Sequence, residues 1–381
     1  MKVLFVINSM GAGGAERSLA QMVPGFAERG IESKIVCLSG RRTEVGTESA
    51  DLPVRYMTAS RWFGRLRELR SVIDSERPDV LHTTLFDSDI IGRIATIGRD
   101  VPVMTSLVNT SYDPSRMSDP NITPWKLHVV RHIDGFTARR FTDHFHALTE
   151  PVKDSNVSAL GIDPNRVSVI PRGRDREWLG EPSADRRAEG RRRLGIAEDA
   201  TLVINVGRQE FQKGQETLLH AAALLRDPMP NMRTVIAGKE GNVTRQLAAT
   251  HAELDLSGVV EFLGYRSDVP DLVAAADIFA FPSVYEGLGG AVIEAMGLGI
   301  PVIASDIPVL AAVVSDGESG LLTPPGDPVA LADAIGRLAK DPATASAMGA
   351  RGYEIFEDRY RLDAVNSAMA DLFLSMAQPG H

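Results

Sequence analysis

The stretch that decides the fold is PSVYEGLGGAVIEAMGLGIPVIAS, residues 282–305. It places Glu286 in a glycine-rich loop and Glu294 beyond the pair Gly289–Gly290, in a segment with a helical pattern. A helix that begins at the glycine pair carries Glu294 about five residues in, roughly 7 Å along its axis. The helix dipole favours a glutamate within the first turn and therefore explains Glu294 poorly. Carboxylates accept hydrogen bonds from hydroxyl groups, so both glutamates are candidates for ligand binding.

Short apolar runs recur on both sides of that stretch, each followed by glycine or polar residues and then by a helical pattern. Such runs, apolar on both faces and separated by amphipathic helices, are typical of parallel strands covered by helices. The predicted strands span 3–7, 33–38, 79–83, 101–107 and 144–149 in the first half, and 201–207, 233–238, 259–264, 278–283 and 301–305 in the second. Because the series occurs twice, the sequence predicts an α/β chain with two doubly wound parallel sheets.

The length of 381 residues agrees with two domains at about 150 residues each. We expect a first domain over 1–170 and a second over 171–354, because the charged stretch between residues 172 and 193 reads as a linker and a surface helix. The segment 353–374 has the pattern of a last amphipathic helix. Parallel strands of one sheet end at a common edge, where ligands bind in such folds. The loops that follow strands should therefore carry the function.

Composition excludes several classes of protein. The net charge of −9 disfavours a general nucleic-acid binder, which needs a basic surface. The single cysteine, Cys37, rules out an internal disulfide and a cysteine-based zinc cluster, and it fits a reducing compartment. The first apolar run is too short for a signal peptide or a membrane span. We therefore expect a cytoplasmic protein.

The loop after the first predicted strand, residues 8–19, contains Gly11, Gly13 and Gly14. Glycines let the backbone approach a ligand, and the helix that follows directs its amide end at an anion. A tight turn that needs a positive φ is the alternative. The spacing lacks the third glycine of the dinucleotide fingerprint, which weighs against a nicotinamide oxidoreductase.

The loop after the first strand of the second half, residues 206–219, carries Arg208 and Lys213, and Gly214 opens the next helix. Two cations and helix amides suit a diphosphate, although a solvated surface pair is the alternative. A diphosphate over the start of the helix that holds Glu294 would have Glu286 near one of its substituents and Glu294 near the other. A sugar on one side and a ribose on the other form a coherent hypothesis.

These stretches together resemble the retaining glycosyltransferases of family 4, which have the two-domain GT-B fold with Rossmann-like domains facing across a cleft. The resemblance covers nearly the whole chain and is strongest from Val206 to about Pro325. There, two glutamates separated by seven residues lie inside a PS…EG…EAM…G-x-PV pattern, downstream of R-x4-KG. The family fold also implies that the C-terminal helix, over 355–381, packs back on the first domain.

The resemblance implies a role for each donor-side residue. Arg208 and Lys213 would hold the donor diphosphate, and Glu286 would contact the transferred sugar. Glu294 would bind the donor ribose. The remaining donor-binding positions, which would line the base pocket and the start of the helix, are Gly264, Tyr265, Arg266, Leu288, Gly289 and Gly290.

On the acceptor side, the resemblance places Gly13, Gly14 and Glu16 in a glycine loop of the family. Many relatives carry a histidine just after the strand that corresponds to 101–107, where this chain has Val108 and Asn109. Asn109 can donate a hydrogen bond but cannot take a proton near neutral pH. His82 matches a histidine that relatives often have. For it, an acceptor contact and a purely structural role are equally open.

The implied reaction transfers a hexose-type sugar from a nucleoside diphosphate sugar with retention of configuration. UDP-sugars are preferred and GDP-sugars remain open. The acceptor would be a glycan, a lipid-linked sugar or a small molecule bound by loops 40–60 and 108–135. No cofactor and no metal are expected, and the acidic run 87–89 should begin a helix. A non-catalytic subunit that binds sugar nucleotides is the alternative function.

The run RWFGRLRELR interleaves basic side chains with two aromatic ones. A weak contact with an anionic membrane surface is one interpretation, and a solvated helix whose aliphatic stems cover the core is the other. The basic residues concerned are Arg61, Arg65, Arg67 and Arg70.

Overall fold

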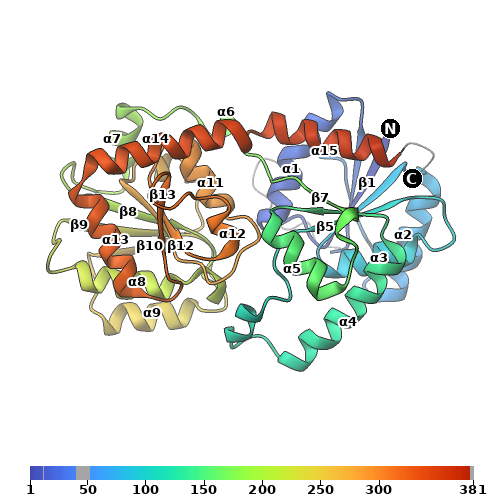
Figure 1. Cartoon of the computed structure of the whole chain (residues 1–381), viewed down its shortest axis with the longest axis horizontal. Coiled ribbons are helices and arrows are strands. Elements are labelled where there is room, and N and C mark those ends of the chain that lie inside the picture. The colour runs from blue at the N-terminus through green and yellow to red at the C-terminus, as the bar shows by residue number, and fades with distance from the viewer. Residues whose placement is uncertain (12, 40–51, 378–381) are drawn as a thin grey trace. The chain divides into compact units, whose positions relative to one another are not determined.

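The computed structural model describes residues 1–11, 13–39 and 52–377. It divides into two compact units (Figure 1). Unit 1 comprises Met1–Gly173 and Arg361–His381, and unit 2 comprises Arg174–Tyr360. Each unit is built on one parallel sheet, with seven described strands in unit 1 and six in unit 2. This is the predicted α/β architecture of two doubly wound sheets.

The sheet of unit 1 has the strand order β3-β2-β1-β4-β5-β6-β7. The chain therefore runs outward from β1 in one direction and then from β4 in the other. A switch of direction between β1 and β4 lies near the middle of the sheet. The strands are β1 (Lys2–Ile7), β2 (Glu32–Cys37), β3 (Val54–Tyr56), β4 (Val80–Thr84), β5 (Val103–Leu107), β6 (His144–Ala147) and β7 (Val167–Val169).

Helices of unit 1 form two groups. Helix α1 (Gly14–Ala27) packs against α15 (Leu362–Met376), and their shared core brings the rings of Phe5, Phe26 and Phe373 to centroid distances between 5.6 and 6.0 Å. In the other group each helix contacts the next along the chain. This group consists of α2 (Trp62–Glu76), α3 (Phe86–Ala95), α4 (Pro124–Phe141) and α5 (Glu150–Leu160), and short 3-10 turns lie at Pro114–Ser118 and Pro164–Arg166.

The sheet of unit 2 has the order β10-β9-β8-β11-β12-β13, so its direction switches between β8 and β11. Its core is formed by apolar residues from the strands and from the helices that cover them. The strands are β8 (Thr201–Val206), β9 (Met232–Ala237), β10 (Val260–Gly264), β11 (Ile278–Phe281), β12 (Val302–Ser305) and β13 (Gly320–Thr323). The helices are α6 (Arg176–Leu179), α7 (Ala184–Arg193), α8 (Gln215–Leu225), α9 (Thr244–Glu253), α10 (Val269–Ala274), α11 (Gly290–Gly297), α12 (Pro308–Ala311), α13 (Pro328–Lys340) and α14 (Pro342–Arg359), and a 3-10 turn spans Phe211–Lys213.

All ten predicted strands are confirmed, and each predicted end differs from the observed one by two residues or fewer. The three strands that were not predicted, β3, β7 and β13, have three or four residues each, too few to show a period. Among the described residues no helix combines the length and the apolar character needed to cross a membrane.

The prediction of one last helix over 353–374 is wrong. Two helices cover it: α14 belongs to unit 2 and α15 to unit 1. The break lies at Arg361, whose backbone is extended with φ −67° and ψ 135°. The guanidinium of Arg361 pairs with Asp363 in the first turn of α15 at 2.8 Å. The amphipathic pattern continues through the break because each helix buries one face, but in a different core.

Candidate functional site

The predicted donor residues follow the carboxyl ends of strands in unit 2. The loop 207–214 follows β8 and the loop 282–289 follows β11, and these two strands are neighbours at the switch of strand direction. Doubly wound sheets bind their ligands at this position. The topology therefore brings together two loops that the sequence separates by about seventy residues.

Lys213 and Glu286 meet between these loops. Nζ of Lys213 lies 2.5 Å from Oε1 of Glu286, and the two side chains are 19% and 8% exposed. The ammonium group also lies 4.9 Å from the ring centroid of Phe281, at the end of β11. A mostly buried ion pair beside an aromatic face holds the cation in a defined place. A ligand with negative charge would meet a fixed positive group there.

Backbone contacts hold the first loop against the second. Gly214 has φ +59°, and a Cβ there would lie 1.9 Å from the carbonyl oxygen of Pro282. Only glycine allows this approach. The side-chain amide of Gln212 donates to the backbone carbonyl of Tyr285 at 2.9 Å, and the side-chain amide of the buried Gln215 donates to the backbone carbonyl of Gly207 at 3.0 Å. The prediction that a helix opens at Gly214 is confirmed, since α8 begins at the next residue.

Arg208 lies on the same loop and is directed to solvent. Its side chain is 58% exposed, and its Nη1 is 3.8 Å from Oε1 of Glu210. That separation is a weak surface ion pair. Arg208 can therefore move toward a ligand at little cost, whereas Lys213 is already fixed. The predicted phosphate contact of both residues remains a prediction.

Helix α11 begins at Gly290, as predicted, after Gly289 in the left-handed conformation at φ +79°. Glu294 lies one turn into the helix and is buried. Its Oε1 accepts a hydrogen bond from Nε of Arg174 at 2.8 Å. Sequence reasoning missed Arg174, because the charged stretch between residues 172 and 193 was interpreted as a linker and a surface helix.

The segment predicted to line a base pocket follows β10. Gly264 adopts φ +65°, and its carbonyl accepts from the amide of Gly238 at 2.8 Å. Tyr265 is half exposed, and Nζ of Lys239 lies 4.6 Å from its ring centroid. Arg266 pairs with Asp268 at 2.6 Å. The segment thus offers an aromatic face at the carboxyl edge of the sheet, two strands from β8.

In unit 1, the predicted glycine loop follows β1, but α1 begins at Gly14, earlier than the predicted end of the loop at residue 19. Glu16 lies in the first turn and accepts a hydrogen bond from the hydroxyl of Ser9 at 3.0 Å. A Cβ on Gly13 would lie 2.2 Å from Oε2 of Glu16. The glycine therefore leaves room for the carboxylate, which turns back over the loop at the carboxyl edge of the sheet.

Asn109 follows β5 at the same edge, where its side-chain oxygen accepts from the amide of Thr110 at 2.8 Å. The candidate acceptor loop 40–60 lies outside the described residues over 40–51. The other candidate loop, 108–135, contains the first half of α4, in which no residue from 124 to 133 is buried.

His82 lies within β4 and is 1% exposed. Its Nε2 is 2.7 Å from the hydroxyl of Ser106, which is in turn 2.8 Å from Nδ1 of His146. Burial, together with the nearby Arg172 guanidinium, holds the pKa of His82 well below its ordinary value. A neutral, buried imidazole agrees with a purely structural role for His82, which is one of the two alternatives that the sequence left open.

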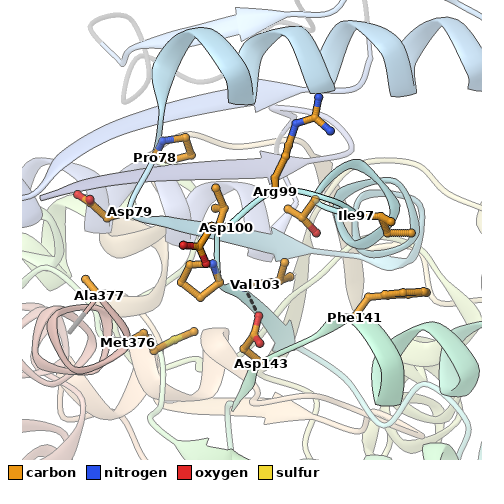
Figure 2. A pocket seen from close by; sticks show the side chains of 13 residues that line it. Pro78, Asp79, Ile97, Arg99, Asp100, Val103, Phe141, Asp143, Met376 and Ala377 are labelled. Carbon is orange, nitrogen blue, oxygen red and sulfur yellow. Dashed lines mark hydrogen bonds between the residues drawn. The ribbon is translucent and has the colours of Figure 1, made fainter. Parts of the chain in front are cut away.

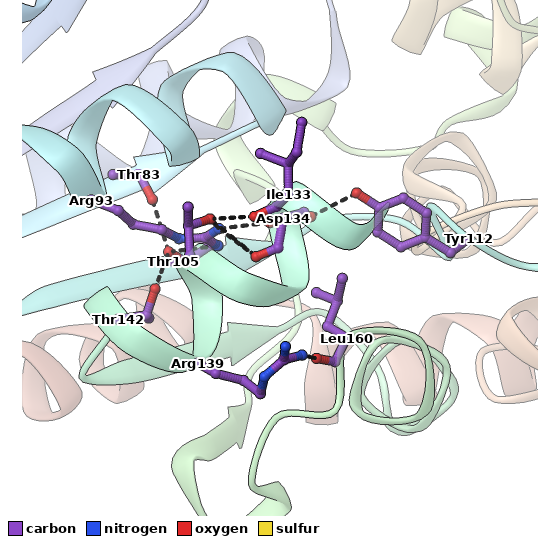
Figure 3. A network of polar contacts seen from close by, with 10 residues as sticks. Thr83, Arg93, Thr105, Tyr112, Ile133, Asp134, Arg139, Thr142 and Leu160 are labelled. Atoms are coloured by element: carbon purple, nitrogen blue, oxygen red, sulfur yellow. Dashed lines mark hydrogen bonds and ion pairs between the residues drawn. The ribbon is translucent and has the colours of Figure 1, made fainter. Parts of the chain in front are cut away.

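A second polar network joins α3, α4 and the strands of unit 1 (Figure 3). Arg93 is fully buried and pairs with Asp134 of α4 at 2.6 Å. The other carboxylate oxygen of Asp134 accepts from the hydroxyl of Tyr112 at 2.7 Å. The network therefore fastens the loop after β5 to α4. Asp89, one turn before Arg93, is buried, and burial raises its pKa to about 7.

The acidic run 87–89 lies in the first turns of α3, as predicted. Asp87 accepts from the side-chain amide of Asn8 at 3.3 Å, and Asn8 itself accepts from the amide of Ser88 at 3.0 Å. The run thus ties α3 to the loop after β1.

A pocket of about 530 Å³ opens at the opposite edge of the sheet in unit 1 (Figure 2). It is lined by residues that precede β4, β5 and β6, including Asp79, Asp100 and Asp143. Asp143 accepts from the amide of Val103 at 2.7 Å, and Asp79 accepts from the amide of Lys2 at 2.6 Å. These two carboxylates cap strand starts. The pocket therefore lies away from the loops that carry the predicted site.

The basic run of α2 is only partly at the surface. Arg61 and Arg67 are exposed, whereas Arg65 donates to the carbonyl of Ala59 at 3.2 Å and Arg70 to that of Ile94 at 3.1 Å. Two of the four arginines thus brace the helix against its neighbours. The predicted membrane contact remains a prediction.

Two family descriptions together match most of the chain. "Glycosyl transferase 4-like domain" matches residues 13–173, and "Glycosyl transferases group 1" matches residues 186–355. A D-inositol 3-phosphate glycosyltransferase from Xylanimonas cellulosilytica is 30% identical over 304 residues, which cover 77% of this chain and 71% of that protein. The chain belongs to glycosyltransferase family 4, the glycosyl transferases of group 1. The recognition made from the sequence is confirmed.

Other family 4 relatives align over different lengths. A D-inositol 3-phosphate glycosyltransferase from Streptomyces bingchenggensis is 33% identical over 241 residues, which cover 61% of this chain. The chain spans about half the length of that relative, at 52%. A protein of the same name from Actinosynnema mirum is 28% identical over 400 residues, and the match covers 95% of this chain and 94% of that one.

Solved structures match the family 4 chain in its fold. The structure of Alr3699/HepE from Anabaena in complex with UDP-glucose has a TM-score of 0.86 at 23% identity, covering 98% of this chain and all of that one. Sucrose-phosphate synthase from Thermosynechococcus elongatus has a TM-score of 0.82 at 21% identity and covers 99% of both chains. The predicted GT-B fold is confirmed.

Proposed function

We propose that this protein is a retaining glycosyltransferase that moves a hexose-type sugar from a nucleoside diphosphate sugar to a hydroxyl group of an acceptor. The observation that carries the proposal is the Lys213–Glu286 pair at 2.5 Å, held at the switch point of unit 2 beside the loop that leads into α11. UDP-sugars are the preferred donors and GDP-sugars the alternative. Support for uridine comes from the Anabaena HepE structures, which contain UDP, UDP with glucose, and UDP-glucose.

In this proposal the diphosphate lies over the amide end of α11. Gly289 and Gly290 have no side chains that would keep a phosphate away from the helix amides. Lys213 contributes a fixed positive charge, and Arg208 moves in from its exposed position to complete the clamp. Charge that develops on the departing diphosphate is stabilised by groups already in place, which is usually the largest part of enzymatic catalysis.

The transfer itself breaks the bond between the sugar C1 and the diphosphate oxygen, and the electron pair stays on that oxygen. The acceptor hydroxyl forms the new bond to C1 on the same face, and its proton passes to the departing phosphate. Glu286, which is paired with Lys213, contacts the transferred sugar. No protein base is needed in this route, which agrees with Asn109 in place of a histidine after β5.

The acceptor is a glycan, a lipid-linked sugar or a small molecule. The curated relatives in the comparison carry the name D-inositol 3-phosphate glycosyltransferase, which favours a phosphorylated small molecule as the first acceptor to try. Glu16, turned over the loop after β1, would bind an acceptor hydroxyl. We expect no cofactor and no metal.

The test is a donor panel of UDP- and GDP-sugars, followed by the anomeric configuration of the product by proton NMR. We expect slow donor hydrolysis without acceptor, an α-linked product from an α-linked donor, and full activity in the presence of a chelator. An inverted product or loss of activity with the chelator would contradict the retaining, metal-independent assignment. Stabilisation of the fold by UDP without any hydrolysis or transfer would favour the alternative, a sugar-nucleotide-binding subunit.

We also propose a weak contact between unit 1 and an anionic membrane surface. Trp62 and Phe63 at the start of α2 are 42% and 79% exposed, beside the exposed Arg61 and Arg67. On α4, Trp125 and three further large apolar side chains are at least 46% exposed, on a helix that also carries Lys126, Arg131, Arg139 and Arg140. Aromatic and basic side chains on one amphipathic helix are typical of binding at a membrane surface.

The membrane contact is tested by measuring how much of the protein sediments with anionic and with neutral lipid vesicles. We expect binding to the anionic vesicles only, and loss of it in a Trp125→Ser/Phe63→Ser variant. Leu224→Ser, which changes a similarly exposed apolar residue in unit 2, is the matched control. Equal binding to both kinds of vesicle, or none, would overturn this contact and leave the transferase proposal intact.

A further inference from the structure

Arg174 is the first residue of unit 2 and an arginine in the run RGRD that has a buried side chain. Its backbone amide donates to the carbonyl of Tyr360 at 2.8 Å, which fixes the chain where the arginine begins. Its Nε donates to Oε1 of Glu294 at 2.8 Å, and the two side chains are 8% and 6% exposed. This guanidinium is therefore buried, and its hydrogen bond to Glu294 within unit 2 holds it in one orientation.

The other end of the same guanidinium lies at the start of α11. A Cβ on Gly290 would lie 1.9 Å from Nη2 of Arg174, so the guanidinium rests directly against the first residue of the helix. The chain reaches this point through Gly289 at φ +79°. One planar group thus spans the first turn of α11, with Nε on the carboxylate of Glu294 and Nη2 beside the amide end.

These two contacts have different chemical consequences. The contact with Glu294 balances the charge of a buried carboxylate and fixes its direction. The position beside Gly290 places a fork of N–H donors where an anion at the helix amides would lie. Guanidinium groups bind phosphate through paired hydrogen bonds, which a lysine cannot form. A carboxylate near a diphosphate would otherwise repel it.

We propose that Arg174 is a third cationic residue of the donor site, which orients Glu294 toward the ribose through Nε and contacts the diphosphate through Nη2. The inference rests on the proposed function and extends it, because Arg208 and Lys213 were the phosphate-binding residues expected from the sequence. Arg174 makes the two parts of the donor, ribose and diphosphate, depend on one side chain. Their contributions to binding should therefore be coupled.

The experiment measures the affinity of the full-length protein for uridine, UMP and UDP by calorimetry in wild type and in Arg174→Met. We expect the variant to bind uridine several-fold more weakly, because Glu294 loses its orientation. It should bind UDP at least a further tenfold more weakly, because the phosphate contact is lost as well. Glu294→Gln should weaken uridine and UDP by the same factor. Of these two variants, only Arg174→Met should therefore lower the ratio of UDP to uridine affinity.

Three further variants separate the effect on binding from the effect on folding. Arg174→Met leaves Glu294 buried without its counter-ion, so the double variant Arg174→Met/Glu294→Gln removes both charges and should regain the wild-type melting temperature without regaining UDP affinity. Arg174→Lys keeps the charge but cannot span both contacts, and we expect an intermediate loss. Arg186→Met, which breaks a different ion pair of unit 2 with Asp271 at 2.8 Å, is the control and should leave UDP affinity unchanged.

The outcomes are distinct. An unchanged ratio of UDP to uridine affinity in Arg174→Met would show that the arginine only neutralises Glu294, and the inference would fail while the transferase proposal stands. A wild-type protein that binds neither UDP nor GDP would overturn the proposed function, and the inference with it.

Discussion

At the scale of single residues, the candidate donor site of unit 2 has two basic residues held in mostly buried ion pairs and a third that is exposed to solvent. Lys213 is fixed by Glu286 at 2.5 Å, and Arg174 is fixed by Glu294 at 2.8 Å. Arg208, which lies between these two residues in the sequence, is exposed. Each glutamate of the stretch 282–305 thus has a partner before any ligand binds. The two carboxylates are acceptors whose directions are set by cations.

The first prediction concerns Lys213. Lys213→Met keeps the length of the side chain and removes the charge that the proposed function places at the departing diphosphate. We expect kcat to fall by about 10²–10³, the usual effect of removing one preorganised charge-stabilising group. Steady-state kinetics with the preferred donor measures it. Lys340→Met, which changes an exposed lysine at the end of α13, is the control. A kcat within a few-fold of wild type would contradict the role of Lys213.

The second prediction concerns the ribose contact of Glu294. Hydrogen bonds to charged groups contribute about 1.5–3 kcal/mol, so Glu294→Gln should weaken UDP binding about 10- to 100-fold. Removing the 2′-hydroxyl from UDP should weaken binding to wild type as well. Because both changes delete the same contact, they should not add in a double-mutant cycle. If the two losses of binding free energy are additive, Glu294 does not contact the 2′-hydroxyl of the ribose.

At the scale of elements, the close approach between the loops after β8 and β11 depends on Gly214. Gly214→Ala adds a Cβ at φ +59° that meets the carbonyl oxygen of Pro282 at 1.9 Å. Gly317→Ala is the matched control, because Gly317 has φ +75° and no atom within 4 Å of the added Cβ. Strain alone costs about 1 kcal/mol in the control. We expect a larger loss in Gly214→Ala together with a weaker response to UDP in thermal unfolding. Equal losses in the two variants would contradict this account.

The buried carboxyl of Asp89 predicts a pH dependence of stability. Its pKa is about 7 in the folded protein and about 3.9 in an unfolded chain. The folded state therefore binds the proton more tightly, and stability from this group is lost as pH rises from about 4 through 7. Asp89→Asn should thus gain stability relative to wild type between pH 5 and pH 8, by more than about 1 kcal/mol. Chemical denaturation at several pH values measures the difference, and Asp154→Asn, at an exposed residue of α5, should show none.

Sequence reasoning succeeded where a pattern repeats. Ten of the thirteen described strands were predicted because each is a run of apolar residues long enough to be buried on both faces. The break at Arg361 was missed because the apolar period continues across it. Arg174 was missed because an arginine in a charged stretch reads as solvated, and only the fold brings Gly290 and Glu294 to it. The sequence predicted that Lys213 and Glu286 belong to the same ligand site, but it did not predict that they form an ion pair with each other.

At the scale of the whole molecule, unit 1 is completed by the last helix of the chain. Phe373 of α15 contacts Phe5 and Phe26 with its ring edge-on, and all three rings are buried. Phe373→Ala should destabilise unit 1 by about 3–5 kcal/mol, the cost of a large cavity in a core. Denaturation followed separately in the two units would show an earlier transition for unit 1 alone. Leu374→Ala, at an exposed neighbour, is the control. A single transition shifted as a whole would show that the units unfold together.

The hydrogen bond from Arg174 to Tyr360 joins the first residue of unit 2 to its last. A Cβ on Gly173 would also lie 2.5 Å from Cα of Leu362, so the outgoing and returning segments touch. Unit 2 is therefore inserted into unit 1 through two chain segments that lie next to each other. A chimera with another unit 2 needs only two junctions, and these are neighbours in the folded protein. Because the proposed donor site belongs to unit 2, we expect that exchanging the segment 174–360 for that of another family member changes the choice of nucleotide sugar and leaves the recipient's acceptor preference in place.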